Sequence, residues 1–176
     1  MIVLNDHKIK RIEASDTIRR NSYDSACSAK LSIGIKIGEK VAIEWRIQIH
    51  CDFLKTHVND YNGYWYFIGV VTNKCNQFDT ACGELVNSYG ISGRDNFVFD
   101  GSQTQAYEYK RYEKYSKSFT SDDIIHVLFD DENKLTFTNE TTGFKYQMQL
   151  PKDDKIIWYP AVSLLTKDGT YQLLPS

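Results

Sequence analysis

The stretch that decides the fold is residues 124–150, which read IIHVLFDDENKLTFTNETTGFKYQMQL. Apolar side chains recur there at every second position, beginning with Ile125, Val127 and Phe129. Two polar segments, Asp130–Lys134 and Asn139–Gly143, interrupt the alternation. A period of two that is broken by turn residues is typical of antiparallel strands with one face on the core and the other in water. This stretch therefore predicts three strands joined by two tight turns.

The same pattern occurs upstream. Residues 31–37 alternate, and after the turn at 38–40 residues 41–49 show the clearest alternation in the chain. Because the turn is short, we expect these two segments to pair as a hairpin. Residues 64–72 are almost continuously apolar, which predicts a strand that is buried on both faces. A short segment at 88–91 precedes a turn, and a further strand is expected at 97–99, so the chain is predicted to be all-β.

Length and composition bound the class of protein. The chain has 176 residues, 41% hydrophobic and 25% charged, so we expect one globular domain over residues 1–176. Residues 1–30 are expected to form an N-terminal extension and first loop, and residues 31–174 the core sandwich. The net charge of -2 does not favour phosphate binding, so we expect no nucleic-acid partner.

The cysteines and the N-terminus indicate the compartment. None of Cys27, Cys51, Cys75 and Cys82 forms a C-x-x-C pair, so no zinc site is expected. The first residues lack the basic and apolar regions of a signal peptide, and no window of eighteen residues is apolar, so we expect neither secretion nor a membrane span. We therefore predict a cytoplasmic, reducing location with free thiols. The sequon at Asn139 is expected to be only a hairpin turn.

Five segments occur in an order that matches a known family. They are residues 44–47 (EWRI), 68–71 (IGVV), 88–90 (SYG), 125–137 (IHVLFDDENKLTF) and 158–163 (WYPAVS). This series resembles the SPRY domain, the interaction module of many tripartite-motif ubiquitin ligases and SOCS-box adaptors. The resemblance runs from about Leu31 to Leu174. Histidine at 126, where the family has glycine, and tyrosine at 89, where it has tryptophan, mark a divergent member.

The resemblance implies a bent, concanavalin-like β-sandwich of two antiparallel sheets that has no catalytic residues. It also implies that a protein or peptide segment binds to loops at one end of the sandwich, in substrate recognition for ubiquitin ligation or in scaffolding. By position these loops are residues 19–23, 73–87, 102–118 and 166–169. Loops on a rigid scaffold can vary without disturbing the core, and interfaces favour aromatic and arginine anchors. The candidate partner-binding residues are Arg20, Tyr23, Phe78, Tyr107, Tyr109 and Lys167. The alternative for each aromatic residue is that it packs its own loop against the sandwich.

The remaining residues allow two other functions to be considered, catalysis and nucleic-acid binding. His50 and His57 flank Cys51 and Asp52, but no nucleophile elbow or H-E-x-x-H motif is present, so we expect no catalysis, metal or cofactor. The tyrosines and lysines of 107–117 could stack on single-stranded nucleic acid, although two glutamates dilute the charge.

A carbohydrate-binding, lectin-like sandwich stays open as the alternative function. It usually requires an exposed tryptophan. Trp45 and Trp158 are expected in the core, and Trp65 lies in a strand that is expected to be buried. The sequence leaves the oligomeric state open.

Overall fold

The computed structural model describes residues 2–4, 9–12, 17–20, 27–31, 35–36, 42–50, 66–74, 87–92, 97–100, 110–111, 122–164 and 170–174. Every regular element in these ranges is a β-strand. Over the same ranges, no helix is long and apolar enough to cross a membrane. The all-β prediction is therefore confirmed.

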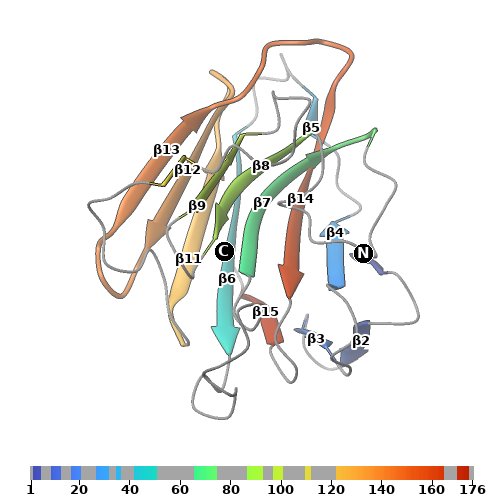
Figure 1. Cartoon of the computed structure of the whole chain (residues 1–176), viewed down its shortest axis with the longest axis vertical. Helices are drawn as coiled ribbons and strands as arrows, with labels where there is room; N and C mark the ends of the chain where they lie inside the picture. The colour runs from blue at the N-terminus through green and yellow to red at the C-terminus, as the bar shows by residue number, and fades with distance from the viewer. Residues whose placement is uncertain are drawn as a thin grey trace.

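The strands form two antiparallel sheets (Figure 1). The first sheet runs β1 (Ile2–Leu4), β4 (Cys27–Leu31), β14 (Ile157–Leu164), β7 (Tyr66–Thr72), β8 (Ser88–Ser92), β9 (Phe97–Asp100) and β10 (Lys110–Arg111), and β5 (Ile35–Lys36) also pairs with β14. The second sheet runs β13 (Lys145–Gln149), β12 (Lys134–Asn139), β11 (Ile124–Phe129), β6 (Ile43–His50), β15 (Thr170–Leu174), β3 (Thr17–Arg20) and β2 (Ile9–Ile12). The first thirty residues thus supply strands to both sheets, so the expected boundary at residue 31 does not coincide with an edge of the sandwich.

The alternation in the sequence places the core. Along β6 the side chains of Trp45, Ile47 and Ile49 are buried, while those between them are half-buried. β11 repeats this pattern and pairs with β12, which in turn pairs with β13, as the sequence predicted. From the first sheet, Trp158 and Tyr89 enter the same core and meet edge to face, with ring centroids 5.2 Å apart. Trp45 and Trp158 are therefore core residues, as expected.

The expected hairpin between residues 31–37 and 41–49 is wrong. β5 pairs with β14, and β6 pairs with β11 and β15 in the other sheet. Alternation specifies which face of a strand is buried but not which strand lies beside it. The chain therefore changes sheets between β5, which ends at Lys36, and β6, which begins at Ile43.

β7 is buried on both faces, as its apolar run predicted. All six residues from Phe67 to Thr72 are buried. Gly69 pairs with Gly90 of β8, and the ring of Phe67 lies over both. A Cβ at Gly69 would come within 2.0 Å of the Tyr89 carbonyl oxygen, and one at Gly90 within 2.4 Å of the Ile68 carbonyl oxygen. The contact between the two strands therefore requires glycine at both positions.

One tyrosine ties the two sheets together. Tyr171 of β15 is 2% exposed, and its hydroxyl lies 3.2 Å from the backbone carbonyl oxygens of both Phe67 and Ser163. Phe67 and Ser163 are register partners on β7 and β14 of the first sheet. The hydroxyl therefore bridges from the second sheet to the two central strands of the first, close to where β14 ends.

Candidate functional site

The predicted binding loops fall into two groups, because the strands that precede them end at opposite ends of the sandwich. β14 runs antiparallel to β7, so that Trp158 lies opposite Thr72 and Leu164 opposite Tyr66. The eight residues of β14 separate its two ends by roughly 23 Å at 3.3 Å per residue. We name these ends of the sandwich the Thr72 end and the Thr170 end, since β15 begins at Thr170 beside the point where β14 stops.

Two of the loops leave from the Thr170 end, at the bottom of Figure 1. β3 reaches this end with Arg19 opposite Thr170, and β4 starts there with Cys27 opposite Leu164. The connection after β3 passes from the second sheet to the first, and the connection after β14 passes back. Their strands are direct neighbours in both sheets, so the two crossings begin and end side by side. They carry the positions of Tyr23 and Lys167.

The other two loops leave from the Thr72 end. The connection after β7 is closed at its base, where Thr72 N donates to Asn87 O (3.1 Å) and Asn73 N donates to Ile157 O (2.9 Å). β9 also ends there, because Asp100 lies opposite Tyr89. The predicted residues that follow these strands are Phe78, Tyr107 and Tyr109. The loops expected at one end of the sandwich are therefore rooted at both ends.

The six candidate residues themselves remain predictions. Arg20 is the last residue of β3, where a loop was expected, and its backbone pairs with Ile9. The other candidates lie outside the described residues: Tyr23, Phe78, Tyr107, Tyr109 and Lys167.

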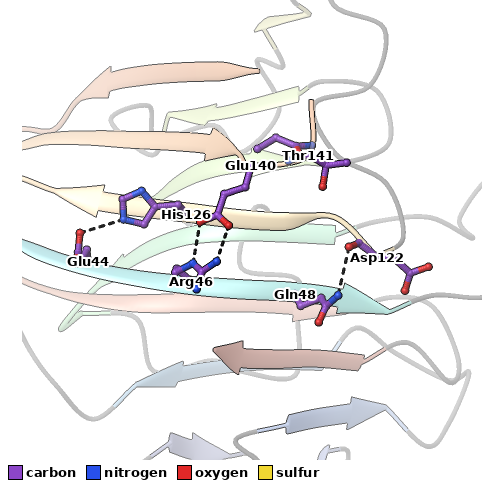
Figure 2. A network of polar contacts seen from close by, with 8 residues as sticks. Glu44, Arg46, Gln48, Asp122, His126, Glu140 and Thr141 are labelled. Carbon is purple, nitrogen blue, oxygen red and sulfur yellow. Dashed lines mark hydrogen bonds and ion pairs between the residues drawn. The ribbon is translucent and has the colours of Figure 1, made fainter. Parts of the chain in front are cut away.

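A row of polar pairs covers the outward face of β6 and β11 (Figure 2). Glu44 Oε2 lies 3.1 Å from His126 Nε2, and His50 Nδ1 lies 2.8 Å from Asp122 Oδ1. Between them Gln48 Nε2 donates to the Asp122 carbonyl oxygen at 3.4 Å. These side chains alternate with the core residues of the same strands, which is why they share one face. The row runs toward the Thr170 end, which His50 reaches opposite Thr170.

The shortest contact in this row belongs to an arginine–carboxylate fork. Arg46 Nε donates to Glu140 Oε1 at 2.8 Å, and Arg46 Nη2 donates to Glu140 Oε2 at 2.6 Å. Such parallel charge-assisted bonds are short and directional. The hydrogen bond from Arg46, together with its charge and that of His126, lowers the pKa of Glu140, and the hydrogen bond to Glu140 raises the pKa of Arg46. Both partners are about one-third exposed, so the pair lies at the surface.

Asn139 positions Glu140 for this contact. Its side chain is 1% exposed, and Nδ2 donates to the buried Asp123 Oδ2 at 2.9 Å. Its Oδ1 accepts from the backbone N–H groups of Thr141 (2.9 Å) and Thr142 (3.1 Å). The opposite orientation of the amide would set like groups against one another, so the chemistry of its neighbours fixes this one. The sequon therefore forms a hairpin turn, and its amide nitrogen is inside the fold.

Sequence reasoning did not find this row. Arg46 and Glu140 are 94 residues apart, and the only local signals were polar residues on the outward phase of β6 and an asparagine at the start of a turn. Among the described residues, no group of three His, Cys, Asp or Glu side chains is placed to hold a metal ion.

Neither a family model nor a curated protein sequence matches this chain. Several solved structures do match it. The SPRY domain of human HERC1 is 14% identical with a TM-score of 0.61, and the match covers 94% of this chain and 91% of that one. The TRIM65 PSpry domain is 10% identical with a TM-score of 0.66, covering 96% and 86%. A human SPRY domain is 14% identical with a TM-score of 0.64, covering 98% and 96%. The chain therefore has the fold of SPRY domains, and the resemblance inferred from the sequence is confirmed at the level of the fold.

Proposed function

We propose that this domain is a protein-interaction module that binds a short segment of a partner protein at the Thr170 end of the sandwich. The observation that carries the proposal is the pair of adjacent crossings between the sheets, after β3 and after β14. Each loop starts on a strand that neighbours the strand where the other loop ends, and two loops placed in this way on a rigid sandwich can form one continuous surface. The likeness to SPRY domains supports the general class of function.

In this proposal Arg20, Tyr23 and Lys167 contact the partner. Arginine and tyrosine are the residue types that most often dominate an interface, because each buries a large area and still forms hydrogen bonds. The neighbouring row of polar pairs supplies a polar rim: His50 and Asp122 lie at the margin of the same end. The shape and the hydrogen bonds of this surface would then determine which partner binds, without a catalytic step. Substrate recognition for ubiquitin ligation, or scaffolding in the cytoplasm, is the setting we propose for this binding.

Carbohydrate binding is less well supported. Lectin-like binding usually uses an exposed tryptophan, whereas Trp45 is 6% exposed and Trp158 is 0% exposed. Trp65 lies outside the described residues.

Two triple variants test the proposed function, and each is the control for the other. The first replaces Arg20, Tyr23 and Lys167 by alanine, at the Thr170 end. The second replaces Phe78, Tyr107 and Tyr109 by alanine, at the Thr72 end. Tagged domains are used to capture proteins from lysate, bound proteins are quantified by mass spectrometry, and thermal unfolding confirms that each variant is folded.

The proposal predicts that the Thr170-end variant captures at least tenfold less of the specific protein. Replacing each of two or three interface anchors by alanine should cost more than about 1 kcal/mol of binding free energy. The Thr72-end variant should retain the captured protein. Retention by the Thr170-end variant would contradict the assignment, and loss by the Thr72-end variant alone would move the binding surface to the opposite end.

A further inference from the structure

β13 forms one edge of the second sheet. β13 is the last strand of that sheet, and within the described ranges it pairs only with β12 (Figure 1). The side chains of Lys145, Gln147 and Gln149 are exposed, whereas Tyr146 and Met148 point toward the core. This edge therefore belongs to a regular strand with one wet face and one apolar face.

Two hydrogen bonds fix which backbone groups point outward. Asn139 N donates to Phe144 O at 2.8 Å, and Leu150 N donates to Asn133 O at 2.9 Å. Hydrogen-bonded pairs recur at every second residue of an antiparallel ladder. The pairs between these two are therefore 137 with 146 and 135 with 148, in the observed register. It follows that the N–H and C=O groups of residues 145, 147 and 149 point away from β12.

An outward row of N–H and C=O groups is a template for a further strand. We propose that β13 accepts an extended segment of a partner protein as an added antiparallel strand. This inference deepens the proposed interaction function and rests on it, but it concerns the edge of the sheet rather than the loops of the Thr170 end. The added strand would extend the second sheet beyond β13.

The charge at this edge indicates which residue type the partner segment should carry. Lys145 is the one charged residue of β13, and no described acidic side chain forms an ion pair with it. The nearest acids along the hairpin are committed elsewhere, because Glu132 pairs with Lys134 and Glu140 pairs with Arg46. Opposite charges across a strand pair stabilise it. The partner segment should therefore place an acidic residue opposite Lys145.

The remaining positions complete the pattern. Residues opposite Gln147 and Gln149 face water and should be polar. The residue opposite the half-buried Tyr146 faces the apolar side and should be β-branched. Read antiparallel, with its first residue opposite Gln149, the segment is polar, apolar, polar, apolar, acidic. The peptide Thr-Val-Thr-Val-Glu fits this pattern, and Thr-Val-Thr-Val-Lys is its charge-reversed control.

The test is fluorescence anisotropy of both labelled peptides with the full chain. Gln147→Pro removes an outward N–H without breaking the ladder to β12, and proline is tolerated at such edge positions. Gln147→Ala is the matched control: it loses the same side-chain bond to Thr136 Oγ1 (3.0 Å) but keeps the N–H. Lys145→Glu reverses the charge, and it tests the proposal independently if the proline variant is unfolded.

We expect the acidic peptide to bind the wild-type chain about two- to fivefold more tightly than the basic one, and Lys145→Glu to reverse that preference. Gln147→Pro should weaken binding about tenfold or more, because its ring also blocks the approach of a strand, whereas Gln147→Ala should stay within about twofold. The Thr170-end variant should bind the peptide normally, so the loop assignment and the edge assignment can fail separately.

Three results would overturn the edge proposal. They are no peptide binding up to about 1 mM, equal binding by the proline and alanine variants, and a peptide preference that does not follow the charge at 145. Sedimentation of the wild-type chain adds a fourth. A dimer that Gln147→Pro abolishes would mean that a second copy occupies the edge instead.

Discussion

Replacing Asn139 should destabilise the domain far more than its place next to a surface turn suggests. Asn139→Ala removes a hydrogen bond to the buried Asp123 carboxylate, at 2.9 Å, and two bonds from the N–H groups of Thr141 and Thr142. A hydrogen bond to a charged group contributes about 1.5–3 kcal/mol, whereas exposed N–H groups regain water and lose little. We expect a loss of about 2–4 kcal/mol of unfolding free energy, out of the 5–15 kcal/mol or so of a typical domain.

Asn139→Asp should cost more than Asn139→Ala at neutral pH. It sets a second carboxylate against Asp123, which is 5% exposed. Repulsion and burial should raise the pKa of the new carboxyl at position 139 above its unfolded value. A group whose pKa is raised on folding destabilises the protein at high pH, and that cost falls as the pH is lowered through the raised pKa. The aspartate variant should therefore recover stability on acidification relative to the alanine variant.

The assay is urea unfolding at several pH values, followed by tryptophan fluorescence, to which the buried Trp45 and Trp158 contribute. A surface substitution at the exposed Lys152 is the control and should change the unfolding free energy by less than about 0.5 kcal/mol. If Asn139→Asp is as stable as the wild-type chain at neutral pH, the contact between Asn139 and Asp123 does not exist and the reasoning fails.

Three further experiments test separate parts of the structure. Arg46 lowers the pKa of Glu140, so the Glu140 carboxylate stabilises the fold above the unfolded pKa of about 4.3. This stabilisation is lost as the pH falls through the lowered pKa of the folded state. Glu140→Gln should therefore flatten the pH dependence of the unfolding free energy below about pH 4.3. Tyr171→Phe should cost about 1–3 kcal/mol in urea unfolding, because buried carbonyl groups lose the bridging hydroxyl; an unchanged midpoint would contradict the bridge. Gly90→Ala should cost at least about 3 kcal/mol or prevent folding, whereas Gly143→Ala, in open space at a φ of 73°, should cost only about 1 kcal/mol; equal thermal midpoints would refute the close approach at Gly90.

The sequence predicted the local structure of β11, β12 and β13 because the information there is local. Each strand pairs with the next across a short turn, and the alternation of residues 124–150 indicates which face of each strand is buried. The apolar run at 64–72 likewise predicted a doubly buried strand, and the structure buries residues 67–72 on both faces.

The neighbours of β6 could not be predicted in this way. Its register partners on β11 and β15 lie far along the chain, from Ile124 opposite Gln48 to Leu174 opposite Arg46, and many strands with the same alternation could occupy those positions. For the same reason the fork between Arg46 and Glu140 and the buried contact of Asn139 were invisible in the sequence. The split of the candidate loops between two ends also required the topology, because loop order along the chain does not state which strand ends are neighbours.

The most direct test of the account is capture of proteins from lysate by the wild-type domain and by the Arg20, Tyr23 and Lys167 triple variant, run beside a glycan array. The account predicts specific protein capture that the triple variant loses while it stays folded, with no glycan bound. Glycan binding without protein capture would contradict it and would place this sandwich among the carbohydrate-binding proteins.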